Sequence, residues 1–322
     1  MVGQVIEGKL LRNEHNVVIA GGCRTAIGSF MGAFPSTSPI KLGGVVVRES
    51  IQRAGINPDL VEEVIIGSVL VASHGQNVGR QVSVAAGIPF SVPAYTINKV
   101  CGSSMKAIML GIQGIRCGDA EVVVAGGVEN MSLSPHLLPG LRKGYGIGTV
   151  PLLDSILSDG LTDAFHGVHM GLIAERIAER YCLSREDQDR FAVASQNKAE
   201  AAIKSGRFRE EIVAVEIPDK KGVFLRFAQD EHPRFGSTVD ALAKLKPAFK
   251  LDGTITAGNA SGINDGAAAV VLMSKEKAKE LHVSPLLTIR GYGAIGVDPG
   301  LMGLGPVPAT RKALARGGCR VR

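Results

Sequence analysis

Short runs of Val, Ile and Ala that end at glycine most restrict how this chain can fold. Three of them lie at residues 16–22 (NVVIAGG), 61–71 (VEEVIIGSVLV) and 121–127 (EVVVAGG). Between them, apolar residues recur at helical spacing, which predicts helices over 41–54 and 76–86. Strands that are apolar throughout have both faces buried. The alternation therefore predicts an α/β fold whose mainly parallel sheet is covered by helices on both faces.

One segment combines an extended approach, a cysteine and the start of a helix. Residues 98–107 are NKVCGSSMKA, and the apolar residues after Ser104 recur at helical spacing. Cys101 is thus expected at or near a helix N-terminus, where unpaired N–H groups and the helix dipole stabilise a thiolate, the nucleophilic form. Gly102 and Ser103 leave room for a substrate. The alternative is a buried structural cysteine, the usual environment of a lone Cys.

Composition and charge exclude several classes of protein. The chain has 322 residues, of which 45% are hydrophobic and 20% charged, and this fits about two domains with a large core. The formal net charge is +6, but no basic block is interleaved with aromatic residues, so a nucleic-acid partner is not expected. No stretch of about 20 apolar residues occurs, and we expect no membrane span.

The cysteines point to a reducing compartment. No pair is spaced C-x-x-C, which argues against a zinc site or a redox dithiol. Residues 1–16 have neither the apolar run of a secretory signal nor the pattern of a transit peptide. We therefore expect no metal and a cytoplasmic protein, with the mitochondrion as the alternative. The five cysteines are Cys23, Cys101, Cys117, Cys182 and Cys319.

The pattern changes after the third apolar run. Residues 130–164 are rich in Gly, Pro, Leu and Ser with little periodicity, and a long irregular stretch in a compact protein is often functional. Helices are predicted over 170–181 and 184–204, and a hairpin over 213–227. We interpret 131–262 as an excursion inserted into one α/β domain. The expected parts are a first core half, 1–130 plus 263–285; a loop domain, 131–262; and the start of a second core half, 286–322.

Several motifs follow one another in a fixed order over essentially the whole chain. They are 98–104, GGVENMS at 126–132, DGLTDAF at 159–165, HMG at 169–171, REDQD at 185–189, LKPAF at 245–249, AGNASGINDG at 257–266 and MGLGP at 302–306. Together they resemble the thiolase family, in particular its short-chain acetyl-CoA acetyltransferase branch. Ser104 departs from that branch, where glycine is more usual. The resemblance implies a layered αβαβα fold with the first half complete, the loop domain inserted and the second half incomplete.

The resemblance also implies an activity: condensation of two acetyl-CoA to acetoacetyl-CoA and CoA, or the reverse. Cys101 matches the nucleophile that accepts the acyl group from a CoA thioester. Met302 matches a position beside the acyl group, and the loop domain matches the part that covers CoA. No cofactor is implied besides the CoA thioester substrate, and a homodimer or homotetramer is expected. The residues that match the lining of the CoA channel are Leu161, His169, Met170, Arg234, Phe249, Ala257 and Ser261.

Without the resemblance, these side chains have simpler interpretations. Arg234 would be a surface arginine, and His169, which precedes an apolar helix, would be a capping histidine. Ser261 would be an ordinary loop residue. Met302 would fill the core, as methionine usually does.

The last segment departs from the family pattern. It predicts a strand over 286–296 and a helix over 308–315, without the family's later segments that hold the activating histidine and the acid/base cysteine. One strand and one helix cannot bury two faces of a sheet, so exposed apolar surface is expected here. The alternative function is thus a catalytically incomplete CoA-binding isoform or a fragment that pairs with complete subunits. A cysteine hydrolase that uses Cys101 is a third hypothesis.

Overall fold

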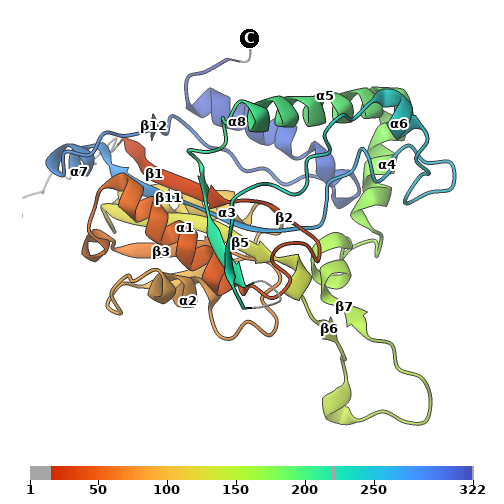
Figure 1. The fold of residues 1–322 in the computed structure, drawn as a ribbon, viewed down its shortest axis with the longest axis horizontal. Coiled ribbons are helices and arrows are strands. Elements are labelled where there is room, and N and C mark those ends of the chain that lie inside the picture. Colours follow the sequence, from red (N-terminus) through yellow and green to blue (C-terminus); the bar gives the residue numbers. More distant parts are fainter. Residues whose placement is uncertain (1–15, 219–221, 321–322) are drawn as a thin grey trace, which may run out of the picture.

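The computed structural model describes residues 16–218 and 222–320, and its centre is one large sheet (Figure 1). A short strand, β2 (Gly28–Ser29), pairs with β11, and β8 (Ile212–Val213) pairs with β1. The main strands, in spatial order, are β12 (Leu287–Thr288), β1 (Val17–Thr25), β11 (Asn264–Ser274), β5 (Val122–Asn130), β3 (Glu63–Gly67) and β4 (Ala94–Ile97).

The sheet is mixed, so the prediction of a mainly parallel sheet is wrong. β3 runs parallel to β4 and β5, but β11 lies antiparallel between β1 and β5. In this register, Met273 lies between Val18 of β1 and Val122 of β5. A strand buried on both faces has the same apolar composition whichever way it runs. Its direction depends on how the chain returns from the 131–262 excursion, which the residue pattern does not specify.

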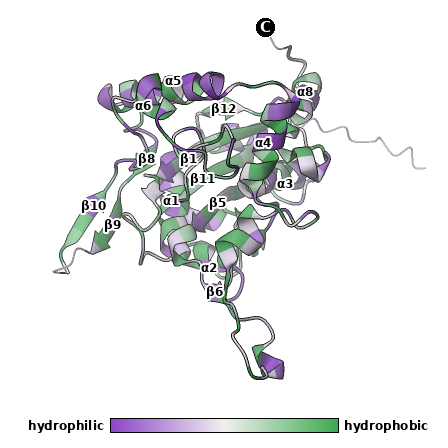
Figure 2. Cartoon of the chain, turned by 90° about the vertical axis from the view of Figure 1, so that its right-hand side faces the viewer, coloured by the Kyte–Doolittle hydropathy of each residue, from purple (hydrophilic) through white to green (hydrophobic). Residues whose placement is uncertain are grey.

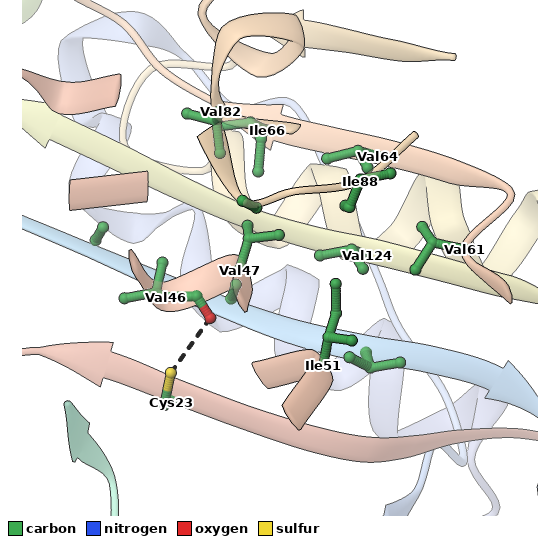
Figure 3. Packing of buried hydrophobic residues seen from close by; sticks show 14 of the residues in the cluster. Cys23, Val46, Val47, Ile51, Val61, Val64, Ile66, Val82, Ile88 and Val124 are labelled. Atoms are coloured by element: carbon green, nitrogen blue, oxygen red, sulfur yellow. Dashed lines mark hydrogen bonds between the residues drawn. The ribbon is translucent and has the colours of Figure 1, made fainter. Parts of the chain in front are cut away.

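Helices cover both faces of the sheet, as expected. α1 (Pro39–Ala54) and α2 (Val78–Ala85) pack on one face and α3 (Ser103–Cys117) on the other. Figure 3 shows the first of these interfaces, in which α1 faces the sheet through Val46, Val47 and Ile51, opposite Val64, Ile66 and Val124. On the other face, Ile112 and Ile115 of α3 cover Ile65 and Val123. Burial of this apolar area is the main stabilising term for the core.

Cys23 has the environment of a buried structural cysteine. Its Sγ donates to the carbonyl of Val46 at 3.3 Å (Figure 3) and lies 3.4 Å from the hydroxyl of Ser50. Burial raises the pKa of this thiol above its usual value. Cys23 is therefore protonated at neutral pH and packs as a small apolar side chain.

The excursion forms the predicted helices and hairpin. α4 (Met170–Arg180) and α5 (Arg185–Lys204) match the prediction closely, and α6 (Val239–Ala243) is a further short helix. The hairpin consists of β9 (Val215–Pro218) and β10 (Phe224–Phe227), and its turn lies outside the described residues. Figure 2 shows that this hairpin and the β6 (His136–Leu137)–β7 (Leu153–Asp154) arm project from the body of the protein. The short helical turns are η1 (Pro58–Leu60), η2 (Met131–Leu133), η3 (Leu141–Lys143) and η4 (Ile156–Leu161).

After α7 (Lys275–Glu280), the chain forms less regular structure than predicted. The expected strand over 286–296 is reduced to β12, a correction with a steric cause. A Cβ on Gly291 would lie 2.5 Å from the carbonyl oxygen of Ala313 in α8 (Pro306–Arg316), so this segment packs closely on that helix instead of pairing as a strand. The apolar surface expected here is present, as Leu286 and Leu287 are each 63% exposed. The segment between β12 and α8 includes η5 (Pro299–Leu304).

Candidate active site

Cys101 lies where the parallel strands end. β3, β4 and β5 run in the same direction, and the turn that follows β4 leads directly into α3. A cleft of about 420 Å³ opens at this edge. Ligands in open α/β sheets bind in such crevices, outside the carboxyl ends of the strands. Of the residues predicted for the site, the cleft brings together Cys101 and Leu161.

Backbone and side-chain hydrogen bonds fix the turn that carries Cys101. The hydroxyl of Ser103 accepts from the Lys99 N–H at 2.8 Å and donates to the Val100 carbonyl at 2.6 Å. Val100 has φ +47°, a conformation that a β-branched residue rarely adopts. Such strain persists only where the surrounding structure imposes it, and it is found most often at functional sites. Cys101 is exposed, so the alternative of a buried structural cysteine is wrong for this residue.

The N-terminus of α3 is close to the sheet and open toward the cleft. A Cβ on Gly67 would lie 2.5 Å from the backbone of Ser103, and a Cβ on Gly127 would lie 2.6 Å from Cβ of Ser104. These two glycines, which end β3 and the apolar part of β5, therefore permit the helix to approach. Gly102 is the N-cap and provides no side-chain hydrogen bond to the first turn. The Ser103 N–H donates to the Val100 carbonyl at 3.0 Å, whereas the N–H groups of Ser104 and Met105 have no acceptor in the described part of the chain and are available to a developing negative charge.

Two carboxylates in the cleft were not predicted as site residues. Glu129 accepts from the N–H groups of Val69 at 2.9 Å and Leu70 at 3.1 Å, and Asp265 accepts from Ser132. Burial raises the pKa of both carboxyl groups, and these hydrogen bonds offset the effect only in part. Both lie inside family motifs. A sequence signal existed for them: an acidic residue inside an apolar strand segment needs buried partners.

No histidine lines this cleft in residues 16–218 and 222–320. Within the same ranges, no group of three or more His, Cys, Asp or Glu side chains is arranged to hold a metal ion. No helix of the described chain is long and apolar enough to span a bilayer. The chemistry available at the cleft is therefore that of a thiol, backbone N–H donors and two carboxylates.

The remaining predicted residues do not line the cleft. His169 stacks on Phe249, with ring centroids 4.7 Å apart, and its Nδ1 accepts from the N–H of Gly171 at 3.0 Å. His169 thus caps α4, which Met170 begins, as its simpler interpretation predicted. An isolated bridge between Thr162 and His169 places this cluster next to Leu161.

Three predicted residues lie on exposed surface farther along the excursion. Ala257 and Ser261 are exposed in the segment between α6 and β11. Arg234 is exposed beside a hollow of about 910 Å³ that Arg226 also lines. Met302 is 39% exposed on η5, which packs on α4, so its interpretation as core filler is wrong.

Comparison with known families identifies the fold. The family model described as "Thiolase, N-terminal domain" matches residues 17–276. The chain belongs to the thiolase family.

Relatives in this family match the chain over almost all of its length. An acetyl-CoA acetyltransferase of Pseudomonas aeruginosa is 55% identical over 303 residues, which are 94% of this chain and 77% of that protein. A cytosolic acetyl-CoA acetyltransferase of Rattus norvegicus is 52% identical over 304 residues, 94% of this chain and 76% of that protein. The structure of the acetyl-CoA acetyltransferase of Bacillus anthracis superposes with a TM-score of 0.93 at 44% identity, covering 95% of this chain and 77% of that one.

Family membership confirms the α/β class and the resemblance drawn from the motifs. The thiolase family model includes both the strand–turn–helix with Cys101 and the excursion that contains α4 to α6.

Proposed function

We propose that this chain is an acetyl-CoA C-acetyltransferase that transfers acetyl groups through Cys101. It would condense two acetyl-CoA to acetoacetyl-CoA and CoA, or run the reverse. The observation that carries the proposal is the exposed thiol at the uncapped N-terminus of α3, in a cleft at the ends of the parallel strands. The names of the relatives support the reaction class.

In the first transfer, Sγ of Cys101 attacks the carbonyl carbon of acetyl-CoA. A new C–S bond to the enzyme forms and the C–S bond to CoA breaks. The proton that the Cys101 thiol gives up is balanced by the proton that the leaving CoA thiolate takes up. During the attack, negative charge develops on the carbonyl oxygen. The N–H groups of Ser104 and Met105 at the start of α3 would donate to that charge, which stabilises the transition state more than the ground state.

In the second transfer, a base removes a proton from the α-carbon of another acetyl-CoA, and this carbon attacks the acetyl carbonyl on Cys101. A C–C bond forms, the C–S bond to Cys101 breaks, and acetoacetyl-CoA leaves while Cys101 returns as the thiolate and regains a proton. The described cleft holds Glu129 and Asp265, both of which accept hydrogen bonds from backbone N–H groups. Because they bind the backbone of neighbouring segments, we propose that both carboxylates shape the wall of the cleft. The first transfer depends only on Cys101 and the helix, and it can be tested by itself.

The excursion is proposed to bind the rest of the CoA thioester. Leu161 lines the cleft, and Met302 lies on η5, which packs on α4. Arg234, an exposed cation whose side chain has no partner among residues 16–218 and 222–320, suits the phosphates of CoA. The full proposed set is Leu161, His169, Met170, Arg234, Phe249, Ala257, Ser261 and Met302, with no cofactor beyond the CoA thioester itself.

Assembly and compartment are further proposals. We infer a homodimer or homotetramer, because the β6–β7 arm exposes large apolar side chains, among them Leu141 (61%), Ile147 (111%) and Leu152 (60%). Exposed apolar patches of this kind usually mark protein–protein contacts. A cytoplasmic location is supported by the name of the cytosolic rat relative.

Mass spectrometry of the intact chain after incubation with acetyl-CoA tests the proposed function. We expect a mass gain of one acetyl group, located on the peptide that contains Cys101 and absent in Cys101→Ser. The matched control is Cys117→Ser, which changes an exposed cysteine at the opposite end of the same helix and should leave the adduct intact. An adduct that persists in Cys101→Ser, or no adduct in the unmodified chain, would contradict the proposal.

A further inference from the structure

Arg24, the next-to-last residue of β1, joins the core to the excursion through a network of ion pairs. Its Nε donates to Glu211 at 2.7 Å, while Nη1 and Nη2 donate to the two carboxylate oxygens of Asp230 at 2.7 and 3.0 Å. The guanidinium also lies over the ring of Phe208, 5.2 Å from its centroid. The side chains of Arg24 and Asp230 are only 20% and 8% exposed. Paired, fork-like hydrogen bonds at such burial fix geometry as well as charge.

The two acidic residues next to each other in this network also bind the backbone of the core. Asp230 accepts from the N–H of Ile27 at 2.8 Å. Glu231 accepts from the N–H groups of Ser29 at 2.8 Å and Ala33 at 3.0 Å, and its own N–H donates to the Ile27 carbonyl. The segment 230–231 is therefore attached to residues 24–33 by side-chain and backbone bonds at once. We call this attachment the Arg24 latch.

The latch leads within three residues to Arg234. His232 packs against Gly262, where a Cβ would come within 2.5 Å of the imidazole, and the Arg234 N–H donates to Gln196 of α5 at 2.8 Å. The Arg234 side chain, in contrast, has no hydrogen-bond or ion-pair partner in the described part of the chain. Its backbone is held on both sides while its guanidinium is free, which is the arrangement of a positioned ligand-binding cation.

Arg24 itself is not available for a ligand, although it lies at the rim of the Cys101 cleft. Its donors are engaged by Glu211, Asp230 and the carbonyl of Thr25. Its positive charge also balances the negative charge of Asp230, which lines the same hollow of about 910 Å³ as Arg234. Without Arg24, the Asp230 carboxylate would be partly unpaired next to Arg234, would weaken the field that attracts an anion, and could pair with that arginine.

We propose that Arg24 is a positioning residue that, through Asp230 and Glu231, holds Arg234 in place for the phosphate-bearing end of the CoA thioester. This inference rests on the proposed function, because it assumes that a CoA thioester occupies the site. It assigns Arg24 to substrate affinity and not to the chemistry at Cys101.

The test compares two thioesters that differ in their phosphates. The rate of Cys101 acetylation is measured as a function of concentration for acetyl-CoA and for acetyl-pantetheine, which has no phosphate. In Arg24→Ala, the KM for acetyl-CoA should rise about tenfold, as expected for loss of one well-placed charged contact. The KM for acetyl-pantetheine and both maximal rates should not change. Arg24→Lys keeps the charge but loses the paired, fork-like hydrogen bonds. Its KM for acetyl-CoA should lie between that of the unmodified chain and that of Arg24→Ala.

A double-mutant cycle distinguishes positioning from a general effect on the fold. If Arg24 acts through Arg234, adding Arg24→Ala to Arg234→Ala should raise the KM for acetyl-CoA by less than about twofold more. Arg190→Ala, which removes an exposed arginine that pairs with Glu186 and Asp187, is the matched control and should leave both KM values unchanged.

Three outcomes would overturn the proposal. The first is that, in Arg24→Ala and in Asp230→Asn alike, the KM for acetyl-pantetheine rises as much as the KM for acetyl-CoA. The latch would then be a structural support only. The second is an unchanged KM for acetyl-CoA in folded Arg24→Ala. The third is full additivity with Arg234→Ala. Failure of the proposed function looks different, because the unmodified chain would then not be acetylated by either thioester.

Discussion

The sheet core and the inserted excursion are stabilised in different ways. The core buries two continuous apolar clusters, one on each face of the sheet. The excursion buries few apolar side chains, but several of its buried residues are charged, including Asp163, Glu175 and Asp189. The free energy gained by burying apolar surface does not depend on the orientation of the neighbouring groups, whereas a buried charge requires particular hydrogen-bond or ion-pair partners. The core can therefore be recognised from residue patterns, while the excursion depends on individual hydrogen bonds.

Two buried carboxylates organise the segment that leads from the excursion back to the core. Glu175 of α4 accepts from the N–H groups of Thr254 and Ile255, each at 2.9 Å. Asp189 of α5 accepts from Arg185 at 2.7 Å and from Asn259 at 2.9 Å. Glu175 thereby satisfies backbone donors, and Asp189 satisfies side-chain donors, that would otherwise lack partners. A loop without regular structure thus acquires a defined conformation.

The largest effect is expected from removing apolar volume in the core. Leu272 of β11 is fully buried and packs so closely on α3 that a Cβ on Gly111 would lie 2.7 Å from it. Leu272→Ala should lower the free energy of unfolding by about 2–5 kcal/mol, measured by urea denaturation. Leu251→Ala, at a site that is 92% exposed in the excursion, is the control and should change it by less than about 0.5 kcal/mol. Similar losses in the two variants would contradict the distinction between the regions.

A smaller and more local effect is expected from Glu175→Ala. The change leaves the buried N–H groups of Thr254 and Ile255 without an acceptor, which should cost about 1–3 kcal/mol. Hydrogen exchange should increase at residues 253–259 and not in β1, β5 or β11. Glu179→Ala, one turn along α4 with an exposed side chain, serves as the control. Increased exchange throughout the sheet would show that the excursion does not open independently of the core.

The helix cap of α5 should contribute less still. Ser184 is the N-cap, and its hydroxyl accepts from the N–H of Asp187 at 3.1 Å. Ser184→Ala should destabilise the excursion by about 1 kcal/mol in the same denaturation experiment. Ser205→Ala, at the other end of the helix, removes no N-cap and should have a smaller effect.

The smallest expected effects concern how the free energy of unfolding changes with pH, and only their direction is predicted. At Glu175, burial acts to raise the carboxyl pKa, but hydrogen bonds from Thr254 and Ile255 outweigh it, so the folded pKa is lowered. Its stabilising contribution is present above the unfolded value of about 4.3 and is lost as the pH falls below it. At Glu129, burial dominates and the folded pKa is raised. That contribution is present below about pH 4.3 and is lost as the pH rises through the folded pKa.

Glutamine variants at these two positions check the signs. The difference in unfolding free energy between the unmodified chain and Glu175→Gln should shrink on acidification. For Glu129→Gln, the variant should gain stability relative to the unmodified chain as the pH rises. Parallel pH profiles for the two differences would mean that the two carboxylates do not differ in the way proposed.

Much of the core and the nucleophile could be predicted from the sequence. The strands around Val17, Val64 and Val122 and the helix after Cys101 are encoded by local apolar spacing, which burial enforces wherever the segment lies. The glycines at the strand ends were visible too. Only the structure shows their role, which is to let the first turn of α3 pack closely on Gly67 and Gly127.

The sequence by itself determined the apolar strands of the core, the approximate bounds of α1, α2, α4 and α5, and that Cys101 lies at the start of a helix. Only the tertiary structure decided the antiparallel placement of β11, the loss of the predicted strand near Gly291, and the joining of Arg24 to Asp230 across 206 positions of the chain. The physical reason is range. Periodicity and capping act between neighbours in the chain, whereas strand direction, steric exclusion by a distant helix and ion pairing depend on groups that only folding brings together.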